Sequence, residues 1–299
     1  MPSFHKFHPH RIRRGIYRRW GLVRRYIRGQ RALAQARRLD SGICAWYGDV
    51  KNVGEQLTPD RWEWVGLRCV NNASPAAPVL GVGSILGRPP VTFRGAILGS
   101  GFLEEGPPVV MPYANVVAVR GKYTLERLGN PTAAVLGDPG ILIDEVYPVE
   151  MGNGRRWQLG IVPHYCDIGD RLLKEIVQTN QGEVTVIDVR RPPSKVIEDI
   201  HACEHILSSS LHGLIAADAL RIPNAWLHLS DKLVGQSFKF QDYYSAFGCE
   251  RYPYSLTGNE VVDDLVAMTS QLASETFYSV ANELKAALVT FADKWRADG

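Results

Sequence analysis

The stretch from Ile206 to Leu227 constrains the fold more than any other part of the chain. It reads ILSSSLHGLIAADALRIPNAWL: an apolar run rich in small residues, a polar turn at Ser210–Gly213, and a helical pattern over Leu214–Arg221 that Pro223 ends before the next strand. In this order the helix directs its free N–H groups and its partial positive charge at whatever lies above the strand. The serine hydroxyls and His212 at that point predict a site for a phosphate or carboxylate. The alternative is a structural histidine in an ordinary βα loop.

The same alternation of short apolar strands and helical segments runs through most of the chain, and it is typical of α/β domains. With 299 residues and 45% hydrophobic content, the chain is long enough to bury two cores. The segment VEMGNGRR at 149–156 divides the alternation into two series, and its glycines, asparagine and charges indicate a linker. We therefore predict two α/β domains, over residues 39–150 and 151–299.

Nine strands are predicted from the apolar runs, at 43–47, 78–81, 96–98, 116–119, 135–136, 158–162, 184–189, 205–209 and 225–227. Helices are predicted after Asn52, at 123–128, 170–178 and 194–202, and in a final amphipathic segment at about 275–296 that reaches back across the first domain. Residues 229–258 are aromatic, polar and irregular, which predicts a loop that covers something.

The net charge of +3 conceals a strongly basic N-terminal arm. Residues 1–38 carry twelve of the 34 Lys and Arg residues and none of the 31 acidic residues, so the rest of the chain is acidic. Apolar residues recur in the arm at steps of three and four, as on one face of a helix: Ile12, Ile16, Trp20, Val23 and Ile27. Basic residues near an anionic leaflet gain about 1 kcal/mol each. We predict that residues 1–38 lie on an anionic membrane surface.

The composition limits where such a protein works. We see no apolar run long enough to cross a bilayer and no signal-peptide core. The five cysteines are scattered and form no CxxC pair, which indicates free thiols in a reducing compartment and argues against a structural zinc site. We expect a cytoplasmic protein, peripheral on the inner face of the cytoplasmic membrane. A nucleic-acid-binding arm is the rival interpretation, but the acidic body would repel a polyanion; a solvated tail without a partner is a third.

Polar residues and glycines follow several predicted strands, and ligands of open α/β sheets bind at the carboxyl ends of strands. Together they predict one shared site, made of Asn52, Gly54, Glu55, Gly83, Ser84, Ser100, Gly101, Arg120, His164, Ser208, Ser209, Ser210, Leu211, His212 and Gly213. Cys166 is interpreted as a buried spectator. The sequence has no GxSxG, Walker A or HExxH signature.

Seven groups of residues also resemble a known family. They are the N-x-G-E motif at Asn52–Glu55, the two Gly-Ser turns, VRGKYTLERLG, GDPGIL, IVPHY and SSSLHGLIAADALRIP. Together, in collinear order over roughly residues 43–228, they resemble the polysaccharide pyruvyltransferases, and most closely the exopolysaccharide branch that includes succinoglycan pyruvyltransferases.

The resemblance implies two Rossmann-like domains facing a cleft, a glycosyltransferase-B-like fold. It implies transfer of pyruvate from phosphoenolpyruvate onto two hydroxyls of a sugar as a ketal, without a metal or further cofactor, at Glu55, Arg120 and His212. Many members have Arg where this chain has Ser210. If that Arg holds phosphate, another cation substitutes for it here, and the predicted substitutes are Arg88, Arg94, Lys122, Arg190 and Arg191.

The chemistry assigns roles to these residues. Ketal formation requires an acid near the enol methylene, a base for the sugar hydroxyls, and cations on phosphate and carboxylate. We predict His212 as general acid or phosphate-side proton donor, Arg120 as the cation, and Glu55 as the base. His164 is a proton shuttle, an anion ligand or a structural histidine.

Two other functions fit the sequence. The first is a nucleotide-sugar glycosyltransferase of the same architecture, in which the Gly turns and His212 hold a diphosphate. The second is a non-catalytic membrane- or RNA-associated protein in which the arm is the function. For the enzyme, the arm predicts a lipid-linked saccharide acceptor at the inner leaflet, and no nucleic-acid partner.

Overall fold

The first half of the chain builds a six-stranded parallel sheet in the computed structural model, which describes residues 27–39, 41–47, 53–132, 134–148, 154–230 and 237–298. The strand order is β2-β1-β3-β4-β5-β6, and every neighbouring pair is parallel. The strands are β1 (Gly42–Trp46), β2 (Arg68–Asn71), β3 (Val79–Leu80), β4 (Ala96–Leu98), β5 (Asn115–Val119) and β6 (Val135–Leu136).

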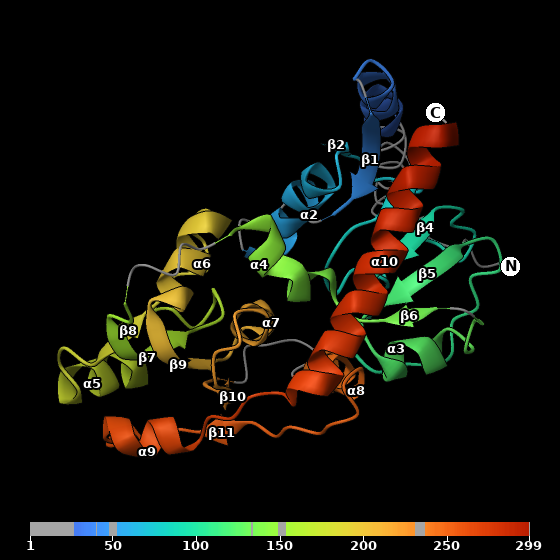
Figure 1. Ribbon diagram of the computed structural model, residues 1–299. Coiled ribbons are helices and arrows are strands. Elements are labelled where there is room, and N and C mark those ends of the chain that lie inside the picture. Colours follow the sequence, from blue (N-terminus) through green and yellow to red (C-terminus); the bar gives the residue numbers. More distant parts are fainter. Residues whose placement is uncertain are drawn as a thin grey trace, which may run out of the picture.

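The second half builds a separate five-stranded parallel sheet in the order β11-β10-β9-β7-β8. Its strands are β7 (Trp157–Val162), β8 (Val184–Val186), β9 (Cys203–Ser208), β10 (Asn224–His228) and β11 (Tyr254–Ser255). In Figure 1 the two sheets occupy opposite halves of the molecule. The predicted fold class of two Rossmann-like α/β domains is therefore confirmed. The boundary predicted at residue 150 lies outside the described residues.

Segments without a helix join β2, β3, β4 and β5 in turn, and helices follow most of the other strands. The helices are α2 (Val53–Trp64), α3 (Lys122–Arg127), the 3-10 helix η1 (Pro139–Leu142), α4 (Ile143–Val146), α5 (Arg171–Thr179), α6 (Pro193–His201), α7 (Leu211–Ala219), α8 (Phe238–Ser245), α9 (Val262–Ala267) and α10 (Ser274–Asp298). Local sequence explains several starts: Asp170 caps α5 by accepting from the N–H of Leu172, and proline occupies the first turn of α6.

The last helix, α10, returns to the first domain. Leu284, Leu288 and Ala292 are buried in the same core as Ile43 of β1, and the indole Nε1 of Trp295 donates to the carbonyl of Gly42 at 3.2 Å. Figure 1 shows α10, in red, running along the half of the molecule that holds β4, β5 and β6. This one helix therefore covers the first sheet although it is encoded after the second.

Residues 229–258 differ from the predicted irregular loop. They contain α8, whose Phe240, Tyr243 and Tyr244 are completely buried. The ring of Phe240 stacks on Trp226 of β10 with centroids 4.3 Å apart, while Asp242 contacts α3 of the first domain. The helix was missed because it is buried on most sides, so it has no amphipathic period. Strand β8 also ends at Val186, three residues earlier than predicted, and β2 was not predicted.

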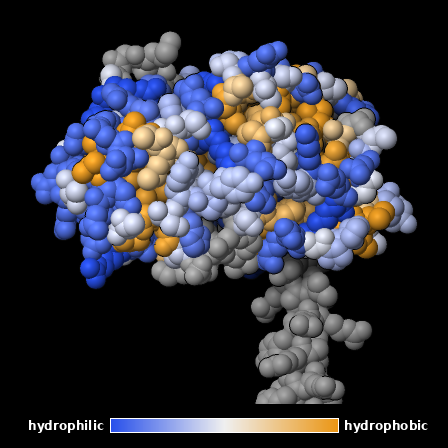
Figure 2. Space-filling view, turned by 90° about the horizontal axis from the view of Figure 1, so that it is seen from below, coloured by the Kyte–Doolittle hydropathy of each residue, from blue (hydrophilic) through white to orange (hydrophobic). Residues whose placement is uncertain are grey.

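Most of the basic arm, residues 1–26, lies outside the described residues, so the membrane prediction is not tested there. Residues 27–36 are helical, and Ala32 and Ala36 pack with Val70 of β2. Within the described ranges, no helix is both long and apolar enough to cross a membrane. On the face in Figure 2, hydrophobic residues form patches separated by hydrophilic ones.

Candidate active site

A cavity of about 200 Å³ lies between the two domains, at the carboxyl ends of strands. It is smaller than the roughly 300–1,000 Å³ of sites for drug-sized ligands, which suits a small anion. Five predicted site residues line it: Ser84 from the first domain, and His164, Ser210, Leu211 and His212 from the second. Its other lining residues are Arg88, Leu103, Tyr165, Val189 and Lys239.

His212 lies in the first turn of α7; the residue is half-buried, and its Nε2 atom is buried. Its Nε2 has no hydrogen-bond partner among the residues that the structure describes. Burial lowers the pKa of His212 to about 3, and the positive charges of Lys239 and Arg120 act in the same direction. The imidazole is therefore neutral near pH 7 in the free protein, and it gains a proton readily only when an anion offsets the nearby cations.

Gly54 carries the contact between the N-x-G-E motif and His212. A Cβ atom on Gly54 would lie 2.1 Å from Nδ1 of His212, closer than any real contact allows. Only glycine therefore lets the start of α2, in the first domain, meet the imidazole ring of α7. Asn52 and the side chain of Glu55 lie outside the described residues, so the predicted base is not placed.

Ser208 and Ser209 shape the turn before α7 and do not line the cavity. Oγ of Ser208 donates to the carbonyls of Val162 and Ser210 at 2.7 and 2.8 Å. Oγ of Ser209 donates to Asp167 at 3.2 Å and accepts from the N–H of His164 at 2.9 Å. Gly213 packs against this turn, since a Cβ there would lie 2.4 Å from Oγ of Ser208. These predicted residues hold the cavity wall in place.

Arg120 is completely buried, and its guanidinium is engaged by protein groups. Nε donates to Oδ2 of Asp242 at 2.8 Å, one terminal nitrogen to Oγ of Ser84 at 2.6 Å, and the other to the carbonyl of Phe102 at 2.5 Å. In this structure Arg120 therefore fastens α8 and Ser84, and does not line the cavity. Its predicted direct contact with the donor stays a prediction, and its observed contacts describe a positioning residue.

The Gly-rich turns support Arg120. A Cβ on Gly101 would lie 2.4 Å from the guanidinium carbon, and the N–H of Gly101 donates to the carbonyl of Gly83 at 3.1 Å. Gly83 has a φ of 111°, a conformation that favours glycine. The hydroxyl of Ser100 donates to the carbonyl of Gly81. Both turns therefore leave space for a buried arginine, and of their predicted residues only Ser84 lines the cavity.

The motif GDPG has a structural role. Oδ1 of Asp138 accepts from the N–H of Gly140 at 2.9 Å and so caps η1. Gly140 then lies against Ile215 of α7, where a Cβ would come within 2.7 Å of the isoleucine side chain. This motif supports α7 from beneath, away from the cavity.

His164 also lines the cavity, and its ring lies beside a thiol. Its Nδ1 is 3.0 Å from Sγ of Cys166, which lies 3.5 Å from Oδ1 of Asp167. Burial, helped by Lys239, lowers the pKa of His164 to about 4, against the opposing charge of Asp167. Cys166 is half-buried and lies beside two titratable groups, so the predicted burial of this thiol is only partial.

Lys239 is the charged residue of the cavity that the sequence did not predict. It lies on α8, within the segment predicted as a loop, and only 7% of it is exposed. Of the five predicted substitutes for the family Arg, Arg88 lines the cavity. Arg190 and Arg191 pair with Asp188 and Asp199, and Arg94 lies over the ring of Tyr113. In the sequence, Lys239 stands between two phenylalanines. That pattern indicates a buried lysine only if residues 238–245 are known to form a buried helix.

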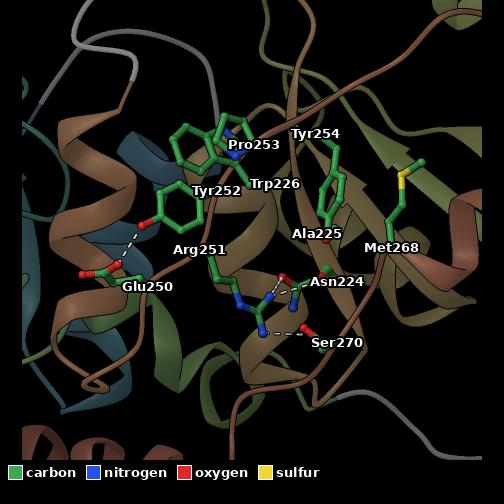
Figure 3. A pocket seen from close by; sticks show the side chains of 10 residues that line it. All are labelled: Asn224, Ala225, Trp226, Glu250, Arg251, Tyr252, Pro253, Tyr254, Met268 and Ser270. Carbon is green, nitrogen blue, oxygen red and sulfur yellow. Dashed lines mark hydrogen bonds between the residues drawn. The ribbon is translucent and has the colours of Figure 1, made fainter.

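The described residues also form other cavities, two of which are lined by strand residues. One, of about 770 Å³, is lined by Trp46, Tyr47 and Asn71 at the ends of β1 and β2 and shares Arg88 with the smaller cavity. The other, of about 320 Å³, runs along β10, where Arg251 donates to Asn224 and Ser270 (Figure 3). No group of three His, Cys, Asp or Glu side chains that could hold a metal ion occurs in the described ranges.

Comparisons with known proteins agree with the family resemblance. A family model described as polysaccharide pyruvyl transferase matches residues 109–230. An uncharacterized protein of Acanthamoeba polyphaga mimivirus is 34% identical over 165 residues, covering 53% of this chain and 56% of that protein. The succinoglycan biosynthesis protein ExoV of Rhizobium meliloti is 28% identical over 213 residues, covering 70% of this chain and 65% of ExoV. The matches thus span less than two thirds of either relative.

A solved structure, the glycosyltransferase SnogD from Streptomyces nogalater, aligns with 75% of this chain and 73% of its own, at a TM-score of 0.37 and 12% identity. That similarity is too low to add to the fold described above. The family resemblance predicted from the motifs is confirmed by these matches: residues 109–230 match the polysaccharide pyruvyl transferase model.

Proposed function

We propose that this protein transfers the enolpyruvyl group of phosphoenolpyruvate onto two hydroxyls of a sugar in a polysaccharide repeat, which forms a pyruvate ketal. The observation that carries the proposal is the small cavity between the domains, which is lined by His212 from the first turn of α7 and by two cations, Lys239 and Arg88. The family match over residues 109–230 supports pyruvyl transfer to a polysaccharide, and the cationic lining supports a small donor that carries both a phosphate and a carboxylate.

The reaction requires two additions at one carbon. A proton adds to the methylene carbon of the donor, and a sugar hydroxyl attacks the resulting oxocarbenium-like carbon and loses its own proton. The C–O bond to phosphate then breaks, inorganic phosphate leaves with a proton, and a second hydroxyl of the sugar closes the ketal. One phosphoenolpyruvate and one diol thus give one ketal and one phosphate.

His212 is the proposed proton donor in this sequence. In the free protein its pKa lies at about 3, chiefly through burial. The phosphate and carboxylate of the donor would place negative charge beside it and raise its pKa, so that protonation accompanies donor binding. This coupling keeps the acid unprotonated until the substrate is present. Its position against Gly54 fixes the ring, and a positioned acid typically contributes roughly 10²–10⁴ in rate.

The acceptor belongs, in this proposal, to the larger cavity at the ends of β1 and β2. Aromatic and amide side chains line it, as suits a sugar, and Arg88 joins it to the smaller cavity. Glu55 is the proposed base for the sugar hydroxyls. Arg28, from the helical end of the basic arm, lines the same cavity. The presence of Arg28 in this cavity supports a lipid-linked saccharide acceptor. In this proposal, residues 1–38 bind an anionic membrane and so bring the cavity to the acceptor at the inner leaflet.

Calorimetric titration of phosphoenolpyruvate into the full chain tests the donor, with UDP and GDP as controls. We expect binding of phosphoenolpyruvate alone. Binding of UDP or GDP without phosphoenolpyruvate would replace the proposal with a nucleotide-sugar glycosyltransferase. For the acceptor, we expect deletion of residues 1–26 to abolish binding to anionic liposomes while leaving donor affinity unchanged. Unchanged liposome binding would contradict the membrane part of the proposal.

A further inference from the structure

The cavity is lined by a cation and an imidazole that described residues leave without hydrogen-bond partners. Lys239 is 7% exposed and forms no hydrogen bond or ion pair with any described residue, and its Nζ lies 5.2 Å from the centre of the Phe240 ring in a cation–π contact. Nε2 of His212 is likewise without a partner within the described part of the chain. A buried cation without a counter-charge is costly to keep. Such an arrangement persists where a ligand supplies the missing charge.

The start of α7 adds donors on the same wall. Among the described residues, the main-chain N–H groups of Leu211 and His212 donate to no acceptor, because the first helical bonds begin at Gly213 and Leu214. Ser210, which caps this helix, carries no charge. The helix end thus offers N–H groups and a partial positive charge, and the full positive charge comes from α8.

Lys239 is held at this place by its own helix. Three residues later in α8, Asp242 accepts from Nε of Arg120 at 2.8 Å and from the N–H and hydroxyl of Thr124, each at 2.7 Å. Residues three apart share a helix face, so the anchoring of Asp242 also fixes where Lys239 lies. Asp242 is thereby satisfied by first-domain groups and does not neutralise Lys239.

The titratable groups around Lys239 do not fully offset its positive charge. His212 on α7, His164 after β7 and Arg120 after β5 contribute no negative charge. Asp167 lies nearby, but its oxygens accept from Ser209 and Ser230 at 3.2 and 2.6 Å. Burial first, and then Arg120, lowers the pKa of Lys239 to about 8, while Cys166 and Asp167 oppose the shift. The ammonium is therefore still mostly charged at pH 7.

We infer that Lys239, together with the first N–H groups of α7, binds the phosphate group of the donor. This inference rests on the proposed function for the identity of the donor. Many family members have an arginine where this chain has Ser210, and Lys239 supplies the positive charge of that arginine here. Lys239 is not among the five substitutes predicted from the sequence. A lysine serves phosphate as a compact point charge, and Nε2 of the neighbouring His212 can donate one hydrogen bond to the same group once the donor is bound.

The test is titration of phosphoenolpyruvate, inorganic phosphate and pyruvate into the full chain and into Lys239→Gln, Lys239→Arg and Lys174→Gln. Lys174 is an exposed residue of α5 and serves as the matched control. We expect Lys239→Gln to weaken phosphoenolpyruvate and phosphate binding on the order of 10–100-fold, the effect of one charge-assisted contact, and to leave pyruvate binding unchanged. Lys239→Arg restores most of the loss, and Lys174→Gln changes nothing.

The pH dependence gives a second readout. In the unsubstituted chain, phosphate affinity falls as the pH rises through about 8, because Lys239 loses its proton there. In Lys239→Arg the affinity persists above that pH. Equal affinity of Lys239→Gln and the unsubstituted chain, with the same thermal unfolding midpoint, would overturn the inference. Phosphate binding that depends on Lys239 without any phosphoenolpyruvate binding would instead overturn the proposed donor and leave the phosphate site.

Discussion

Arg120 and Lys239 are two buried cations that lie beside the same cavity, yet their surroundings differ. The guanidinium of Arg120 donates to Asp242, Ser84 and the carbonyl of Phe102, and none of its surface is exposed. Lys239, on the same helix as Asp242, forms no ion pair in the described part of the chain and lines the cavity. Pairing, more than burial, therefore separates the cation that maintains the structure from the one available to a ligand.

Both cations face His212, and the largest expected effect concerns this residue. Replacement of His212 by Asn keeps a polar side chain but removes the group that can carry the proton. We expect turnover, measured as release of inorganic phosphate, to fall by roughly 10²–10⁴ while phosphoenolpyruvate still binds. Turnover within a factor of three of the unsubstituted chain would show that the proton comes from elsewhere, and His164 would then be the residue to substitute.

The next largest effect distinguishes the two cations by stability. Arg120→Ala leaves Asp242 buried without its ionic partner, and breaking a buried pair in this way costs about 3–5 kcal/mol. Urea denaturation measures this loss in the free energy of unfolding. Arg127→Ala is the comparison, since its half-buried guanidinium donates to two main-chain carbonyls and lies over the ring of Phe102, but has no carboxylate partner among the described residues. A loss below 1 kcal/mol in Arg120→Ala would mean that Arg120 does not hold α8.

The lowered pKa of His212 predicts how the free energy of unfolding depends on pH. The pKa of His212 falls from 6.5 in the unfolded chain to about 3 in the fold. The unfolded state therefore binds more protons between these values, so this contribution to stability is complete above pH 6.5 and declines as the pH falls. At pH 5 the loss is about 2 kcal/mol, from 1.5 pKa units at about 1.36 kcal/mol each. His212→Asn should flatten this decline, measured by denaturation from pH 7 to 5, and an identical slope in both proteins would contradict it.

The sequence predicted the parts of this site that depend on local pattern. The apolar run, serine turn and helix of β9 and α7 follow from neighbouring residues, so the placement of His212 at a strand end was foreseeable. The pairing of Arg120 with Asp242 joins residues 122 apart, and no local period reports it. The contact of Gly54 with His212 spans the two domains in the same way. Lys239 was missed because α8 is buried among aromatic residues and so lacks the polar stripe of a surface helix.

The smallest expected effect is a gain in stability. Removal of the paired Arg120 should destabilise the fold, whereas removal of the unpaired Lys239 should stabilise it. Lys239→Met replaces an unpaired buried ammonium with an apolar chain of similar length. The folded pKa of Lys239 is lowered from 10.5 to about 8, so the fold disfavours its proton at neutral pH by at most about 3 kcal/mol. We expect Lys239→Met to raise the free energy of unfolding by about 1–2 kcal/mol at pH 7, and the gain to shrink as the pH rises from 8 towards 10.5.

Lys174→Met, at the surface, should show no such trend. A loss of stability in Lys239→Met would mean that the ammonium already has a partner in the fold, and Lys239 would then join Arg120 among the residues that maintain the structure.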